Sequence, residues 1–269
     1  MSVTRTLTAE AIRDAGRRRI VWAVILLSLL SLMLIDGCTA CSSGDVTVNG
    51  ETRNIQDVGG AVGTVLFVVL GLWVCLLAGI LGSDHLQQTL EDGSASLCLS
   101  RPISRRQYAL ARLAGALFVA LLPGLALLGA TAGLLHFRSG LTLEPAFGAA
   151  IACVLGAITC CALGMLLSLA LPRLASLLAV FATVSLTAIA NLSARLDGGP
   201  GLLATLDQAG PPLAAAMWTA LDPWVGAVSL AGNTDPATGG SLVIMRLALW
   251  SVGTVVVLLW AFQRRELRF

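Results

Sequence analysis

The sequence contains no lysine, although it has 17 basic residues, because all of them are arginine. A Walker A loop needs a lysine to contact the β- and γ-phosphates of a nucleotide, and Schiff-base chemistry needs a lysine amine. This absence excludes both functions for the chain itself. Any use that it makes of ATP must therefore go through a partner protein.

Charged residues are also scarce. They make up 12% of the chain, whereas a soluble protein carries about 25%. Apolar residues make up 57%, and the mean hydropathy is +0.86. So few charges cannot solvate the surface of a globule. The composition predicts an all-α, polytopic membrane protein in which residues 1–269 form a single transmembrane domain, surrounded by membrane lipid and with no nucleic-acid partner.

Six apolar stretches are long enough, or nearly so, to cross a bilayer, which takes about 20 residues. They cover residues 20–35, 58–82, 109–135, 145–171, 174–194 and 242–262. The first is short enough to be a signal peptide instead. A retained span is favoured, because Asp36 fits badly before a cleavage site and no soluble domain follows. Pro172 and Arg173 alone join the fourth and fifth stretches, which predicts a tight turn.

The arginines lie unevenly along these six predicted spans. Thirteen arginines and six acids fall on the side that holds both termini, whereas four arginines and nine acids fall on the other side. Basic residues accumulate in the cytoplasmic loops of membrane proteins. The charges therefore predict that both termini are cytoplasmic, which agrees with an even number of spans.

The sequence also predicts where three segments outside the spans lie. Segment 1–19 is predicted to be a cytoplasmic helix along the membrane surface, with a solvated basic tail as the alternative. The polar loop 36–57 and the long segment 195–240 are predicted to be extracytoplasmic. Within the latter, residues 213–230 are apolar enough for a seventh span. Asp222 would cost about 2.5 to 3.5 kcal/mol there, which favours an interfacial or re-entrant element.

Small residues indicate where helices can approach one another. Gly59 and Gly63 form one small-x-x-x-small pair, and Gly129 and Gly133 form another. Such pairs let two helix backbones come close. Packing within one chain is favoured over a seam between two copies, and Pro123 is expected to kink the third span.

Few side chains are candidates for chemistry. Asn191 and Arg246 are candidates for a substrate pathway, although an interhelical hydrogen bond and an interfacial position would also explain them. Cys38 and Cys41 lie in the predicted outer loop, where a disulfide is possible and contact with a soft metal is open. No other outer cysteine lies nearby, so we predict no metal site and no catalytic residue.

The segment 83–108, between the second and third predicted spans, carries the most information. Ser83 or Asp84 can cap a short helix that ends at Gly93. Such a helix would lie at the cytoplasmic surface, braced between two spans. It could then transmit movement from a soluble partner. An ordinary inner loop is the alternative.

The second half of this segment predicts a turn followed by a new helix. Pro102 follows Arg101 and breaks the preceding semi-apolar run. Ser104 and Gln107 have the spacing of a capping box, in which each side chain bonds the other residue's backbone N–H. The helix of the third span is therefore expected to restart here.

The same segment resembles the permease subunits of type-2 ABC exporters, including the branch associated with multicopper-enzyme maturation. That family carries an acidic-x-Gly-Thr element, a leucine-rich run and an Arg-Pro-(Ile/Val)-Ser-Arg turn. The corresponding residues here are Glu91-Asp92-Gly93-Ser94, then Leu97 and Leu99, then Arg101-Pro102-Ile103-Ser104-Arg105. The departures are Ser94 for threonine, Thr89 for a frequent acid, and Ala111-Arg112 for Gly-Lys. A weaker match, Leu221-Asp222-Pro223, is similar to a Leu-Asn-Pro element before the family's last span.

The resemblance implies a homodimer of permease subunits above two copies of a separate ABC ATPase, in the inner membrane of a bacterium. ATP and Mg would bind at the ATPase, and this chain would hold no cofactor. The residues that would contact the ATPase are Asp84, His85, Leu86, Gln87, Leu90, Glu91, Gly93 and Ser94. The turn that would brace them consists of Arg101, Pro102, Ser104 and Arg105.

Two other classes of function remain as alternatives to an exporter subunit. A membrane scaffold or immunity-type protein needs no motif. A membrane-embedded enzyme is less favoured, because His85 and His136 lie on opposite predicted sides of the membrane and no acid-base cluster is evident. The sequence does not identify a substrate, since a pathway of Leu, Ala, Gly and Ser carries no readable code.

Overall fold

The computed structural model describes part of the chain. The described residues are 9, 12, 13, 26, 29, 33, 46–48, 51–53, 69–84, 104–139, 144–172, 174–182 and 240–264. Within them, the long helices are α5 (Arg105–Ser139), α6 (Glu144–Ala170) and α10 (Gly240–Arg264). A shorter helix covers Val69–Asp84, and another covers 174–182.

Three of these helices are long and apolar enough to cross a membrane. They cover Arg105–Leu134, Phe147–Ala170 and Leu247–Arg264, which correspond to the third, fourth and sixth predicted spans. The prediction of a helical membrane protein is thus confirmed for the described residues. The number of six spans and the cytoplasmic termini stay predictions.

The other predicted spans are described only in pieces. The helix Val69–Asp84 covers the second half of the second predicted span and continues past its predicted end at residue 82. The helix 174–182 falls within the fifth, and Leu26, Leu29 and Met33 are helical positions within the first. Ala9, Ile12 and Arg13 are helical in the predicted interfacial segment 1–19. Residues 195–239, which include the possible seventh span at 213–230, lie outside the described residues.

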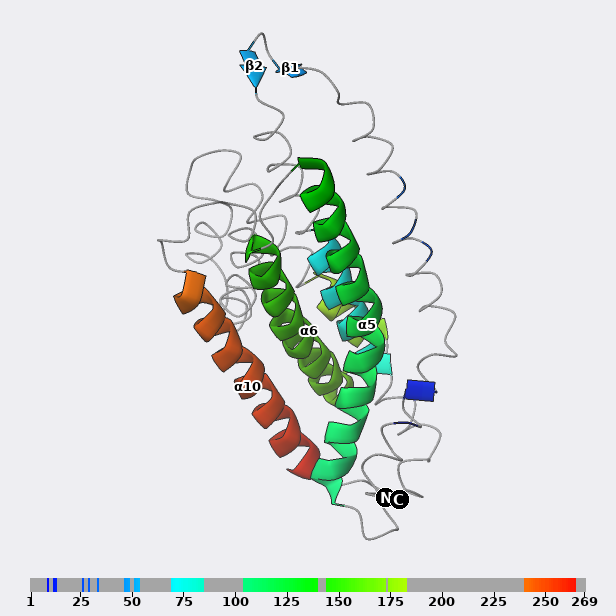
Figure 1. Ribbon diagram of the computed structural model, residues 1–269. Helices are drawn as coiled ribbons and strands as arrows, with labels where there is room; N and C mark the ends of the chain where they lie inside the picture. Colours follow the sequence, from blue (N-terminus) through cyan, green and yellow to red (C-terminus); the bar gives the residue numbers. More distant parts are fainter. Residues whose placement is uncertain are drawn as a thin grey trace, which may run out of the picture.

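A small hairpin adds β-structure that the sequence analysis did not predict. Strand β1 (Val46–Val48) pairs antiparallel with β2 (Glu51–Arg53), and the register places Val48 opposite Glu51. Asn-Gly, the dipeptide between the strands, is typical of two-residue hairpin turns. Figure 1 shows the hairpin beyond the end of α5 at Ser139. The fold is therefore all-α in its membrane helices but not in this loop.

The predicted turn between the fourth and fifth spans is confirmed. Helix α6 ends at Ala170. The last hydrogen bond of this helix runs from the backbone N–H of Leu171 to the Leu167 carbonyl at 2.8 Å. The N–H of Ser176 donates to the carbonyl of Pro172 at 3.0 Å, so the next helix starts at once. A proline fits this place because the first residues of a helix need no N–H partner.

Helix α6 is the centre of the described bundle, since it packs against both α10 and α5. Helices α10 and α5 also contact each other, and Figure 1 shows that they converge at the Arg264 end of α10 and the Arg105 end of α5. The largest fully buried side chains are Tyr108, Phe262, Leu81, Met165, Leu247 and Leu258. Two of these six, Tyr108 and Phe262, lie at the converging ends.

Glycines bring the helix Val69–Asp84 directly against α6. A Cβ atom added at Gly164 would overlap the carbonyl oxygen of Gly79, and one at Gly82 would overlap the carbonyl oxygen of Cys161. The overlapping atoms belong to the backbone, so the overlap could not be relieved by the movement of a side chain. Close approach of this kind is the usual basis of helix association in membranes, where burying apolar surface gains little.

The glycine pair at Gly129 and Gly133 makes no close helix contact among the described residues. A Cβ atom added at either position would meet nothing within 4 Å in the described part of the chain. That face of α5 is turned away from the neighbouring described helices, so the packing of this pair within the chain stays a prediction. Gly59 and Gly63 lie outside the described residues.

Buried hydroxyls in the spans are satisfied within their own helices. Thr131, Thr159 and Ser251 donate to the carbonyls of residues three or four positions earlier, at 2.8, 3.0 and 2.8 Å. Ser168 does the same with Met165 at 2.7 Å. Such bonds remove the cost of a hydroxyl in lipid. The O–H donors of these four hydroxyls are therefore already used and offer a substrate no further donor.

Candidate functional site

The N-terminus of α5 is held by the capping box that the sequence predicts. The backbone N–H of Gln107 donates to Ser104 Oγ at 3.3 Å, and the backbone N–H of Ser104 donates to Gln107 Oε1 at 3.3 Å. The N–H of Tyr108 donates to the Ser104 carbonyl at 3.1 Å, which is the first bond of the helix. The helix starts at Arg105, four residues before the predicted apolar span, because capping satisfies its first N–H groups.

The last turn of α10 is bound to the first turn of α5 through Gln263. Arg106 Nη2 donates to Gln263 Oε1 at 3.0 Å, and Arg105 Nη1 donates to the main-chain carbonyl of Gln263 at 3.5 Å. The carbonyls of a last helical turn have no partner within the helix. A guanidinium at this position also compensates the partial negative charge of the helix end.

A buried aromatic pair lies directly beside these polar contacts. Tyr108 is 0% exposed and Phe262 is 1% exposed, and their rings stack with centroids 6.3 Å apart and planes at 19°. The guanidinium of Arg112 lies 5.4 Å from the centroid of the Tyr108 ring. The Tyr108 hydroxyl has no hydrogen-bond partner within the part of the chain that the structure describes. Ring packing, and not the hydroxyl, therefore holds this pair together.

These five residues, Arg105, Arg106, Tyr108, Phe262 and Gln263, are called the α5–α10 junction below. The sequence analysis named Arg105 in the structural turn but missed its four companions. The two glutamine contacts join residues 158 and 157 positions apart in the chain. No local pattern relates positions so distant, so only the fold could identify the junction.

Of the residues predicted to contact an ATPase, the structure describes Asp84 alone. This residue is the last described position of the helix Val69–Asp84, and it is 7% exposed. The hydroxyl of Ser83 donates to the Ile80 carbonyl at 3.0 Å, as in the interior of a helix. The predicted N-cap at Ser83 or Asp84 is wrong, because a cap residue lies outside the helical conformation that both adopt.

Of the other predicted site residues, Ser104 and Arg105 lie at the start of α5, as described above. Arg246 lies near the start of α10. The remaining ones lie outside the described residues, namely His85, Leu86, Gln87, Leu90, Glu91, Gly93, Ser94, Arg101, Pro102, Asn191, Cys38 and Cys41. Among the described residues, no group of three or more His, Cys, Asp or Glu side chains could hold a metal ion.

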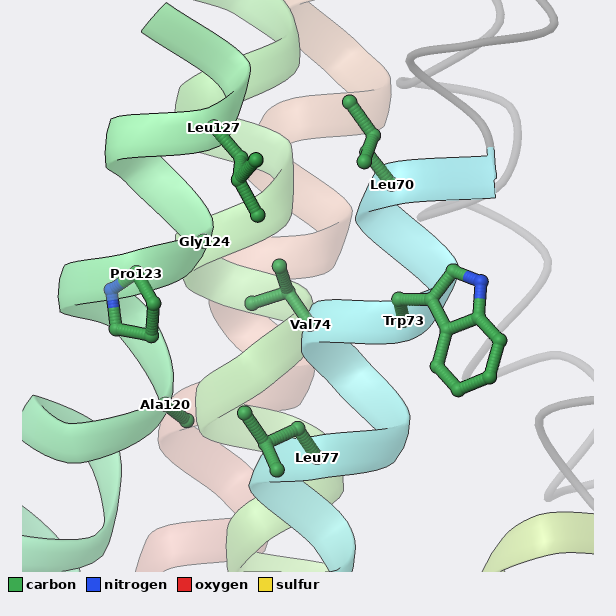
Figure 2. Close-up of a pocket in the computed structure, with 8 residues that line it drawn as sticks. All are labelled: Leu70, Trp73, Val74, Leu77, Ala120, Pro123, Gly124 and Leu127. Atoms are coloured by element: carbon green, nitrogen blue, oxygen red, sulfur yellow. The ribbon is translucent and has the colours of Figure 1, made fainter. Parts of the chain in front are cut away.

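A small pocket lies between the helix Val69–Asp84 and α5, and Figure 2 shows its lining. It is lined by Leu70, Trp73, Val74, Leu77, Ala120, Pro123, Gly124 and Leu127. Its volume is about 10 Å³, which is roughly the space of one water molecule. Val74 points toward Gly124, where an added Cβ would overlap it, and the Trp73 ring extends away from α5. The pocket is apolar and too small for a transport substrate.

A comparison with protein families decides what this arrangement belongs to. The model of the ABC-2 family transporter protein matches residues 6–267, which is nearly the whole chain. The chain belongs to the ABC-2 transporter family. It is thus a membrane permease subunit of an ABC transporter, a kind of component that generally has no catalytic site of its own and works with an ABC ATPase. A comparison with curated proteins finds no significant match.

The capping box is expected to stabilise the start of α5 in this permease. Replacing Ser104 by alanine removes the acceptor for the Gln107 N–H and should cost about 1 kcal/mol. Hydrogen exchange of the backbone amides of Gln107 and Tyr108 is expected to speed up by about fivefold, since 1.4 kcal/mol corresponds to tenfold. Ser104→Thr keeps the acceptor and should retain protection. Equal exchange in Ser104→Ala and the unaltered chain would contradict the role assigned to the cap.

Proposed function

We propose that this permease is the membrane subunit of an exporter and that a separate ATPase drives it through the segment 85–103. Two copies of the chain would assemble with two copies of the ATPase in the inner membrane of a bacterium. Each copy would have six spans with both termini in the cytoplasm. ATP and Mg would bind at the ATPase, which agrees with the absence of lysine, and hence of a Walker A loop, in this chain.

The α5–α10 junction is the observation that carries the coupling proposal. Helix α5 begins immediately after the segment that resembles the coupling region of the family, and its start is fixed by the capping box. The same first turn is bound to the end of α10 through Gln263 and through the Tyr108–Phe262 stack. A displacement of the segment by an ATPase would thus reach two membrane helices at once.

The position of Asp84 refines which residues would touch the ATPase. Its carboxylate is buried at the end of the helix Val69–Asp84, so we assign it to packing at the base of the segment. The contact surface would then start after it, at His85, and continue to Ser94. Glu91 carries the charge of the acidic-x-Gly element and is the best residue to probe.

Charge reversal at Glu91 tests this proposal. The permease would be purified together with the ATPase of its complex, and ATP hydrolysis would be measured for Glu91→Arg. We expect at least a tenfold fall in turnover, because a positive charge would be placed at a contact that is built for a negative one. Glu51→Arg, in strand β2 on the predicted opposite side of the membrane, makes the same change and should leave turnover unaltered.

Two outcomes would reject the proposal. The first is that no ATPase co-purifies with the unaltered chain. The second is that Glu91→Arg and Glu51→Arg hydrolyse ATP at the same rate as the unaltered complex. The first result would favour the scaffold alternative, and the second would show that the ATPase does not drive the permease through Glu91.

A further inference from the structure

One face of α10 consists of exposed apolar side chains, and a charged residue lies at its C-terminal end. Its members recur every three or four positions, as expected for one side of a helix. They are Leu249 (67% exposed), Val252 (62%), Val256 (58%) and Trp260 (54%). The opposite side holds buried Leu247, Leu258 and Phe262. Arg264 follows Trp260 by one turn, and its guanidinium lies 4.2 Å from the centroid of the Trp260 ring.

The length of α10 allows Arg264 to lie at the level of lipid headgroups. The apolar span Leu247–Arg264 has 18 residues, which at 1.5 Å per residue is about 27 Å. The hydrocarbon core of a bilayer is about 30 Å thick. A helix that starts at one boundary of this core therefore ends at the other, and tryptophan beside arginine is typical of that boundary.

Helix α5 brings further positive charge to the same level. Its span Arg105–Leu134 has 30 residues, about 45 Å, and so it reaches beyond the hydrocarbon core. Because Gln263 accepts hydrogen bonds from both Arg105 and Arg106, the start of α5 lies beside the residue that precedes Arg264. Arg106 and Arg264 are both exposed. The N-terminus of α5 adds a partial positive charge.

We propose that this end of α10 and α5 is a binding site for an anionic phospholipid. The guanidinium groups of Arg106 and Arg264 would bind the phosphate, for which their planar donor pairs are suited. One acyl chain would lie along Leu249, Val252 and Val256, with the Trp260 ring at the junction of headgroup and chain. A lipid accounts for both parts of the surface, whereas a free phosphate would use only the arginines.

Lipid binding to the full-length permease tests the site. The chain would be purified in detergent, titrated with dioleoylphosphatidylglycerol or dioleoylphosphatidylcholine, and the bound lipid counted by native mass spectrometry. For the double variant Arg106→Gln/Arg264→Gln we expect at least fivefold less bound phosphatidylglycerol and unchanged phosphatidylcholine. Arg53→Gln/Arg138→Gln removes the same charge on the predicted opposite side of the membrane and should bind as the unaltered chain does.

Single variants separate the lipid site from loss of structure. Arg264→Gln leaves the hydrogen bonds of Gln263 in place and should still lower phosphatidylglycerol binding at least twofold. Arg264→Lys keeps the charge and should retain more than half of the binding. Equal phosphatidylglycerol binding in the double variant and the unaltered chain, or an equal loss in the control, would overturn the proposal.

Two further outcomes would assign the arginines to another ligand. If excess inorganic phosphate displaces the lipid while Trp260→Ala leaves lipid binding unchanged, the site binds free phosphate and the lipid proposal is wrong. It is also wrong if the double variant keeps its lipid but loses a co-purified ATPase, because the arginines would then contact a protein. None of these lipid measurements depends on ATP turnover, so the coupling proposal stands or falls separately.

Discussion

Replacing Gly164 by valine is expected to prevent the permease from accumulating as a folded protein. The added Cβ would overlap the carbonyl oxygen of Gly79, and it would lie 3.2 Å from the Gly79 carbonyl carbon and 3.3 Å from the Ser83 nitrogen. All of these are backbone atoms of a facing helix, so relief requires the two helices to separate. We expect a loss of about 3 kcal/mol or more, at the upper end for overpacked sites. Size-exclusion profiles and thermal unfolding in detergent would measure it.

Gly133→Val is the matched control. It places the same side chain in a membrane helix, but at a position where an added Cβ meets nothing within 4 Å in the described part of the chain. Its effect should stay within about 0.5 kcal/mol. The packing argument fails if both variants are equally damaged, or if Gly164→Val gives the same profile and melting temperature as the unaltered permease.

Phe262→Ala is expected to have a similarly large effect, on both stability and coupling. The substitution removes a fully buried ring from the stack with Tyr108, and a buried Phe→Ala change costs about 3 to 5 kcal/mol in protein cores. The contact that would carry movement from α5 to α10 is lost with it. If the permease is driven through this junction, ATP turnover of the complex should fall at least fivefold at temperatures where the variant is still folded.

Phe118→Ala provides the comparison for this variant. Phe118 also lies on a membrane helix, α5, but its side chain is 50% exposed. The control should unfold and hydrolyse ATP nearly as the unaltered complex does. Phe262→Leu, which keeps an apolar side chain without the ring, should fall between the two. A Phe262→Ala complex that is destabilised but hydrolyses ATP at the normal rate would show that the junction is only structural.

The features that the sequence predicted correctly are those set by composition or by near neighbours. Low charge and long apolar stretches identify membrane helices, because the bilayer demands about 20 apolar residues at a time. The capping box at Ser104 and Gln107 depends on two residues three positions apart, and the turn at Pro172 depends on one residue. Even here a boundary was wrong, since the helix continues through Ser83 and Asp84 instead of ending before them.

Pairing between helices was decided by the tertiary structure alone. A glycine pattern shows which backbones can approach, but not which face turns toward a neighbour. Among the described residues, Gly79 and Gly164 lie against a facing helix, whereas Gly129 and Gly133 do not. In the same way Arg106 and Gln263 meet although 157 positions separate them. The sequence by itself thus determined that the chain is a helical membrane protein and where several helices lie, because those properties depend on local solvation. Which helices touch, and through which residues, depends on the simultaneous fit of several surfaces. Only the folded bundle specifies this fit.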